Sequence, residues 1–151
     1  MPKLLKFLKL FSERAFLTLA LSSFSSLPAF AGGVRIINHG HSSLLIKGGG
    51  QSVLLNPFKA VGCAAGLKEP RLRADVILAS SELADEGARV AQGNYFVNPG
   101  SYRINGMNFE GFASPHDRVD GRRYGLTRIW QWTQGGLRFA HLGGGAAPLT
   151  G

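Results

Sequence analysis

Short runs of apolar and β-branched residues, separated by glycine-rich turns, dominate the chain after residue 31. Such runs are typical of β-strands, and Asn105-Gly106 between two of them is the strongest two-residue signal for a β-hairpin. Gln134-Gly135-Gly136 predicts a second hairpin in the same way. We expect strands over residues 34–38, 43–47, 52–55, 75–79, 95–97, 102–104, 107–112, 126–133 and 137–141.

One segment carries the features of a strand followed by a helix. Residues 75–79 (DVILA) form a nearly continuous apolar run, which suits a buried central strand. A serine at 80–81 can cap the helix that follows, and carboxylates occupy its first turns. We expect this helix over residues 82–91, ending before Gly93. The expected fold class is therefore α/β, β-rich with one clear helix.

The composition fits one folded domain: the chain has 151 residues, 44% of them hydrophobic and 17% charged. The formal net charge is +8, but part of it lies in the lysine-rich first 14 residues. Elsewhere the tightest basic cluster is Arg118, Arg122 and Arg123, interrupted by Asp117 and Asp120. A nucleic-acid site needs a basic stripe, ideally with stacking aromatic side chains. We therefore expect a solvated loop here and no nucleic-acid partner.

The first 31 residues contain the three parts of an export signal in order. A lysine-rich region precedes the apolar residues 15–24, and Ala29-Phe30-Ala31 forms a small-x-small cleavage site. The apolar run is too short for a membrane-spanning helix, which needs about 20 residues. We expect cleavage before Gly32, no stable membrane span afterwards, and export to a periplasm, a thylakoid lumen or the medium. An uncleaved amphipathic anchor is the alternative.

Histidines and carboxylates near strand ends are the first candidates for metal chemistry. His39 and His41 are two residues apart, a spacing that places both imidazoles on one face of a strand. Asp85 and Glu86 are adjacent carboxylates, which suit a hard cation. Ordinary hydrogen bonds for the histidines and charge compensation at a helix start for the carboxylates are the simpler local interpretations.

Two further motifs follow strands. His116 beside Asp117 can be a metal ligand with a supporting carboxylate, or a general base; the alternative is an ordinary turn histidine. The last strand ends in residues 141–145 (HLGGG), whose glycines either let a ligand approach the backbone or simply form a loop. This motif lacks the following helix and the glycine spacing of a dinucleotide site.

The order of these motifs resembles that of the metallo-β-lactamase superfamily, and most closely its ascorbate-6-phosphate lactonase-like branch. Two segments resemble the beginning of that family: the turn Gly40-His41-Ser42, and Asn56-Pro57-Phe58 at a strand end. Residues 74–78, 112–117 and 136–143 resemble strands that precede or carry metal ligands there. The exported form is similar to a cyanobacterial group of Zn-dependent hydrolase-like proteins. The resemblance implies a four-layer αββα sandwich in which metal ions activate a water for attack on an ester or lactone.

The metal motif implied by the resemblance is degenerate in this chain. Where the family has His-x-His-x-Asp-His, residues 81–86 read Ser-Glu-Leu-Ala-Asp-Glu, so only Asp85 matches. Glu86 replaces a histidine, and His116 matches the position of the third histidine. A two-metal site is therefore not expected. One zinc or other divalent ion would be held by Asp85, Glu86 and His116, or no metal binds.

The remaining positions add little to such a site. Gly144 stands at the place of the bridging aspartate and offers only its backbone, just after His141. His41 and His39 are expected close to the three candidate ligands. The single cysteine, Cys63, excludes an internal disulfide.

The length predicts only part of the resembled fold. We expect residues 32–151 to form the N-terminal half of the sandwich, which would expose the apolar inner face of its sheet. The chain is then a truncated product, or it pairs with another copy or with a separate second half. The alternative is a small self-contained β-rich domain.

The expected function is that of a metal-dependent ester or lactone hydrolase, impaired or inactive because metal ligands are lost. Its partner, if it is active, is a small-molecule ester or lactone. The alternatives are a non-catalytic exported binding or scaffold protein on the same fold, and a non-functional fragment.

Overall fold

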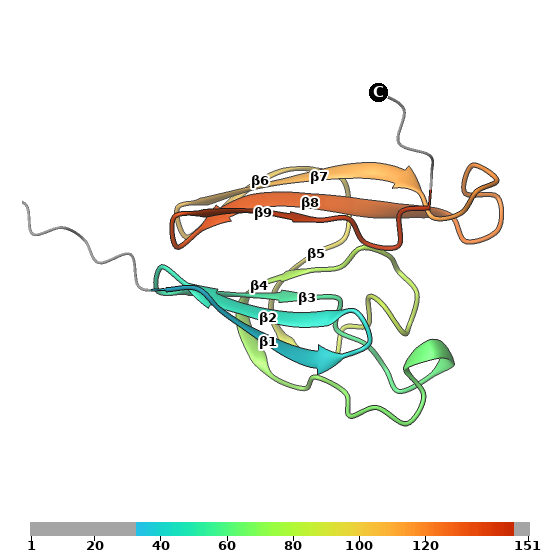
Figure 1. Cartoon of the computed structure of the whole chain (residues 1–151), viewed down its shortest axis with the longest axis horizontal. Coiled ribbons are helices and arrows are strands. Elements are labelled where there is room, and N and C mark those ends of the chain that lie inside the picture. The colour runs from blue at the N-terminus through green and yellow to red at the C-terminus, as the bar shows by residue number, and fades with distance from the viewer. Residues whose placement is uncertain (1–32, 147–151) are drawn as a thin grey trace, which may run out of the picture. The chain divides into compact units, whose positions relative to one another are not determined.

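The computed structural model describes residues 33–146, which form two β-sheets stacked face to face (Figure 1). The export signal expected over residues 1–31 lies outside this range. Sheet A contains, in spatial order, β1 (Arg35–Gly40), β2 (Ser43–Gly48), β3 (Gln51–Leu55), β4 (Arg73–Leu78) and β5 (Gln92–Phe96). Sheet B contains β6 (Gly100–Ile104), β7 (Met107–Pro115), β8 (Leu126–Gln134) and β9 (Leu137–His141). A short 3-10 helix, η1 (Gly62–Ala64), lies between β3 and β4.

Sheet A changes strand direction in its middle. Strands β1, β2 and β3 pair antiparallel, whereas β3, β4 and β5 pair parallel, with Leu54 opposite Ile77 and Ile77 opposite Tyr95. Sheet B is antiparallel throughout. Because β3 and β4 run in the same direction, the loops that follow them leave sheet A at the same edge. That edge carries most of the candidate site residues.

The strands and hairpins predicted from the sequence are confirmed, with small shifts of their ends. Asn105 and Gly106 have φ values of 50° and 81°, and they connect β6 to β7. Gly135 and Gly136 have φ values of 55° and 80° and connect β8 to β9. These left-handed conformations are what a tight hairpin turn requires, and they explain why the turn residues were such clear signals.

The helix expected over residues 82–91 is wrong, because this segment forms turns and no α-helix occurs in residues 33–146. Its backbone forms hydrogen bonds with the loop after β3. The Ala88 N–H donates to the Pro57 carbonyl at 2.8 Å, and the Ala84 carbonyl accepts from the Lys59 N–H at 2.8 Å. At Gly87 a Cβ atom would lie 1.9 Å from the Ser81 carbonyl oxygen. Tertiary hydrogen bonds therefore replace helical ones here. No helix of the described residues has the length and apolar character to cross a membrane.

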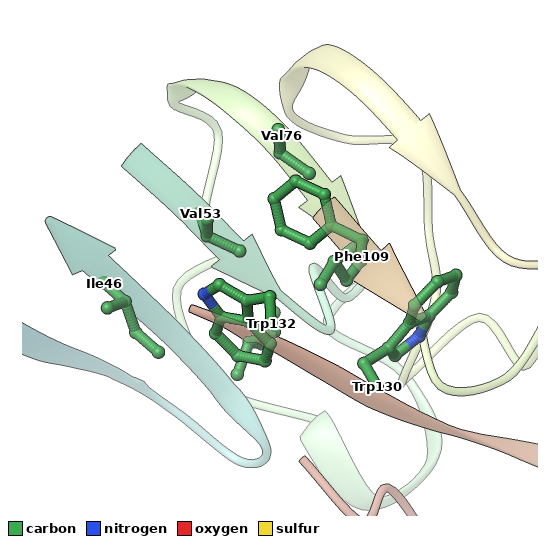
Figure 2. Packing of buried hydrophobic residues seen from close by; sticks show 8 residues of the cluster. Ile46, Val53, Val76, Phe109, Trp130 and Trp132 are labelled. Carbon is green, nitrogen blue, oxygen red and sulfur yellow. The ribbon is translucent and has the colours of Figure 1, made fainter. Parts of the chain in front are cut away.

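The apolar inner faces of the two sheets pack directly on each other (Figure 2). The expectation of an exposed inner sheet face is therefore wrong for the described chain, since sheet B supplies its cover. Trp130 and Phe109 are fully buried, and the ring of Trp132 stacks on Phe139 at a centroid distance of 5.0 Å. The residues of this core cluster are Ile46, Val53, Leu55, Val76, Leu78, Phe109, Trp130 and Trp132.

Hydrogen bonds from β8 fix the position of sheet B on sheet A. The Trp130 indole Nε1 donates to the Ala79 carbonyl at 2.9 Å, just beyond the end of β4. At the C-terminal end of β8, Gln134 is buried and its Nε2 lies 3.3 Å from the Ile46 carbonyl and 3.0 Å from the Gln51 carbonyl. Buried polar groups need such partners, because an unpaired one costs free energy. The middle and the C-terminal end of β8 are thus tied to sheet A.

The outer faces of the two sheets differ. Outside sheet A, Leu45, Leu54 and Ile77 are buried in a second apolar cluster. Outside sheet B, cross-strand neighbours form two rows of exposed, mostly polar side chains. One row is Ser101, Glu110, Gln131 and Ala140, and the other is Arg103, Asn108, Thr133 and Arg138.

We expect Gly111→Ala to destabilise the fold, because the new methyl group would lie 2.7 Å from the Trp130 ring. Overpacking of this kind typically costs about 1–3 kcal/mol of unfolding free energy. Urea unfolding followed by tryptophan fluorescence measures the change. Gly33→Ala is the matched control, because an added Cβ there meets nothing within 4 Å. Equal stability of the two variants would contradict the packing at Trp130.

Candidate functional site

Five segments meet at the edge of sheet A where β3 and β4 end. The start of β8 is joined to the loop after β4, because the Arg128 N–H and the Thr127 hydroxyl both donate to the Ser80 carbonyl, at 2.7 and 3.2 Å. The loops that follow β7 and β9 close over the same place: the Gly144 N–H donates to the Thr127 hydroxyl at 3.2 Å. The site is therefore assembled by both sheets.

Two of the predicted ligands, Glu86 and His116, lie together in this site. The Oε2 atom of Glu86 is 3.5 Å from Nε2 of His116, and their side chains are 17% and 11% exposed. The same Oε2 accepts a hydrogen bond from the Ser81 hydroxyl at 3.0 Å. The Nδ1 atom of His116 is buried and has no hydrogen-bond partner among the described residues. The carboxylate of Glu86 is thus held by two neighbours of this chain.

Gly144 fills the space next to the His116 ring. A Cβ atom on Gly144 would lie 2.0 Å from His116 Nε2, so no other residue fits there without moving the imidazole. The backbone of Gly144 therefore lies where a side chain could not be placed. Gly143 is equally confined, because a Cβ there would lie 2.6 Å from Ser80 Cβ.

A second polar group lies at the end of β3, around Asn56. This residue is buried with a φ of 43°, and its Oδ1 accepts from the Ser80 N–H at 2.7 Å. Its Nδ2 is 3.1 Å from His141 Nε2 and 3.3 Å from Ser42 Oγ. Burial lowers the pKa of His141, which favours the neutral imidazole that can accept the Asn56 amide hydrogen. The Nε2 atom of His141 is therefore already engaged by the side-chain amide of Asn56.

The other predicted ligands do not join the contact between Glu86 and His116. The Oδ2 atom of Asp85 accepts a hydrogen bond from the Cys63 N–H at 3.1 Å, and Cys63 is an exposed free cysteine. His41 is exposed, with its ring edge-on to Phe58 at 6.2 Å. The Nε2 atom of His39 is buried without a hydrogen-bond partner among the described residues.

The donor set does not fit a divalent metal ion. Zinc sites need three or four protein ligands, and within residues 33–146 no three His, Cys, Asp or Glu side chains are grouped so that they could hold one ion. Glu86 and His116 are two donors, and Asp85 is bonded to the η1 segment instead. Gly144, at the position of the bridging aspartate, has no side chain that could bind a metal ion.

The loop after His116 is built around Asp117. Its carboxylate accepts backbone N–H groups from Val119, Gly121, Arg123 and Tyr124 at distances of 2.8–2.9 Å. Burial alone would raise the pKa of this carboxyl group, but the four donors lower it to about 2. Asp117 therefore orders the loop, and the adjacent His116 packs edge-on against Tyr124 at 6.1 Å.

Sequence reasoning missed three residues that hold the site together: Ser42, Ser80 and Thr127. Each is a small hydroxyl residue at a strand end, and Ser80 and Thr127 are fully buried. Nothing local distinguishes them from ordinary turn residues. The available signal was their position directly after or before strongly apolar strands. Ser80 acts there through its backbone N–H and carbonyl.

We expect Gly144→Ala to displace the His116 ring, because the added methyl overlaps Nε2. The free energy of unfolding should fall by about 1–3 kcal/mol, and the His116 imidazole proton resonances should shift. Gly145→Ala is the matched control, since its nearest neighbour is the Leu142 carbonyl at 3.1 Å and not His116. Unchanged His116 resonances in Gly144→Ala would contradict this contact.

The stability that Asp117 contributes should be lost in acid. Its pKa is lowered from 3.8 to about 2 in the folded protein, so the contribution is complete above the unfolded value and disappears as the pH falls through about 2. Asp117→Asn should therefore be less stable than the parent at pH 7, and the difference should shrink toward pH 2. Urea unfolding at a series of pH values measures this. A difference that stays constant with pH would show that the charge of Asp117 is unimportant.

Comparison with known proteins agrees with this architecture. One similar solved structure is that of a protein from Thermotoga maritima, described as a proposed Zn-dependent hydrolase of the metallo-β-lactamase superfamily. It aligns with a TM-score of 0.52 and 22% identity, and the alignment covers 74% of this chain and 50% of that protein. A proposed metal-dependent hydrolase from Parabacteroides distasonis aligns with a TM-score of 0.50 and 16% identity, covering 71% of this chain and 59% of its own.

This chain therefore spans little more than half the length of these structural neighbours. At such identities the likeness establishes the fold. No curated protein matches the sequence. The family model described as the β-lactamase superfamily domain matches residues 35–151, which is most of the chain. The two facing sheets and the family match lead to one conclusion: the chain belongs to the β-lactamase (metallo-β-lactamase) superfamily.

Proposed function

We propose that this protein is an exported relative of metal-dependent ester or lactone hydrolases, of the ascorbate-6-phosphate lactonase-like type, in which the hydrolytic metal centre is lost and activity is impaired. The fold and the hydrolase neighbours support the family part of the proposal. The contact between Glu86 and His116, closed by the backbone of Gly144, supports the loss of the metal centre.

The candidate donors are few, and each is already engaged by other groups of the protein. Glu86 accepts from Ser81 and faces His116, while Asp85 accepts from the Cys63 N–H. Recruiting all three residues to one ion would require Asp85 to move, because the three side chains are not grouped around one point. It would also have to overcome the tight packing of Gly144 against the imidazole. In this proposal the contacts of Glu86, His116 and Asp85 with neighbouring groups of the protein stabilise the fold and do not serve a metal ion.

In this proposal Glu86 and His116 have a structural role. Glu86 lies in the loop after β4, and His116 lies just beyond the end of β7. Their contact therefore adds to the Ser80–Thr127 hydrogen bond that joins the same two regions.

Metal content and hydrolysis of the full chain test the proposal together. The protein is produced in medium containing zinc and manganese, and bound metal is measured by mass spectrometry. Hydrolysis of a panel of small esters and lactones is then measured with and without EDTA. We expect less than stoichiometric metal and no EDTA-sensitive hydrolysis. His41→Ala is a matched control for His116→Ala, because His41 is an exposed histidine outside the Glu86 contact.

The opposite outcome has a definite form. Stoichiometric metal, with EDTA-sensitive hydrolysis that His116→Ala abolishes and His41→Ala preserves, would overturn the proposal and restore a single-metal hydrolase. Hydrolysis that persists in His116→Ala would point to a contaminating activity. A thermal melt of each variant separates a loss of activity from a loss of folding.

A further inference from the structure

A basic hollow lies on sheet A at the end opposite to the Glu86–His116 contact. Its volume is about 470 Å³, within the range of small-ligand sites. The hollow lies where β1 and β4 begin and where the turn between β2 and β3 is formed. The lining residues that matter are Arg35, Lys47, Arg73, Ser52, Asp75 and the glycine turn 48–50.

The strand register brings like charges together in this basic hollow. Arg35 on β1 is directly opposite Lys47 on β2, and both side chains are exposed. Like charges directly opposite each other on neighbouring strands are destabilising. Among the ion pairs of the described residues, none involves Arg35, Lys47 or Arg73. A bound anion would relieve this repulsion.

The single carboxylate of the basic hollow is already engaged. Asp75 Oδ2 accepts from the Ser52 N–H at 2.7 Å and from the Ser52 hydroxyl at 2.6 Å. These bonds from Ser52, with a smaller contribution from Arg73, keep the pKa of Asp75 low. The basic hollow therefore has one negative charge, that of Asp75, against three positive ones. The Asp75 carboxylate is hydrogen-bonded to Ser52. The lining keeps an excess of two positive charges.

The backbone of the turn between β2 and β3 leaves open space beside these cations. Gly49 and Gly50 have φ values of 58° and 74°, which favour glycine, and a Cβ atom on Gly50 would meet nothing within 4 Å. A ligand can approach the main chain closely where side chains are absent. The cations and the open backbone thus border one cavity.

We propose that the basic hollow binds a doubly charged anionic group, the phosphate group of a small molecule. Arginine presents a planar fork of N–H donors that matches the oxygens of such groups, and lysine adds a compact point charge. Arg35, Arg73 and Lys47 supply both kinds of donor. The hollow is open to solvent, so the rest of a phosphate ester can extend beyond the cations.

Titration of the full-length chain tests this site directly. Inorganic phosphate, inorganic sulfate and glycerol phosphate are added at constant ionic strength, with chloride as the replaced anion. The backbone amide resonances of Ser52, Gly49 and Gly50 report the binding. We expect saturable shifts with the divalent anions and none with chloride. Stronger binding of glycerol phosphate than of inorganic phosphate would identify an ester as the preferred ligand.

Matched variants separate a specific site from general positive charge. R35Q/K47Q should weaken binding by roughly tenfold or more, because each lost charge-assisted hydrogen bond contributes strongly. R122Q/R123Q removes the same charge from the loop after β7 and should leave the affinity unchanged. R35Q/K47Q should also keep or raise the melting temperature without ligand, since it removes the opposed charges.

The results that would overturn the site are equally specific. Shifts that do not saturate, or an equal loss of binding in both double variants, would show only general attraction of anions to a basic protein. The absence of any shift would exclude the site. Neither result depends on whether the Glu86–His116 contact is catalytic, because no hydrolysis is measured.

Discussion

The anchoring of β8 to sheet A is the interaction on which the rest of the structure depends. Trp130 is fully buried in the core, and its indole N–H is bonded to the Ala79 carbonyl just past β4. This side chain therefore links the packed core to the position of β8 beside the loop after β4. Thr127 and the neighbouring His116 are brought to Ser80 and Glu86 as a result. The candidate site is thus a consequence of how the core packs.

The sequence predicts the strands well because their signals are local. A turn such as Asn105-Gly106 needs left-handed backbone conformations that few other residues adopt, so it identifies a hairpin wherever it lies in the fold. The segment after β4 was mispredicted for the opposite reason. Its serine and carboxylates are sound helix-start signals, but the hydrogen bonds that decide its shape go to Pro57 and Lys59, far from it in sequence.

The candidate site was predictable only in part, for the same reason. Glu86 and His116 were identified as candidate ligands because their residue types and strand-end positions suggested it, and the structure brings them together. Asp85 lies beside Glu86 in the sequence, yet its carboxylate binds the η1 segment. Neighbouring residues in a turn point in different directions, and only the course of the loop decides which carboxylate reaches the histidine.

The exposed rows on sheet B have a bearing on association between molecules. Side chains such as Glu110, Gln131 and Arg138 make this part of the outer face polar. Arg103 on β6 and Arg138 on β9 also place a positive charge on each outer strand of the sheet. Two copies approaching edge to edge would bring like charges together, which disfavours the growth of a continuous intermolecular sheet.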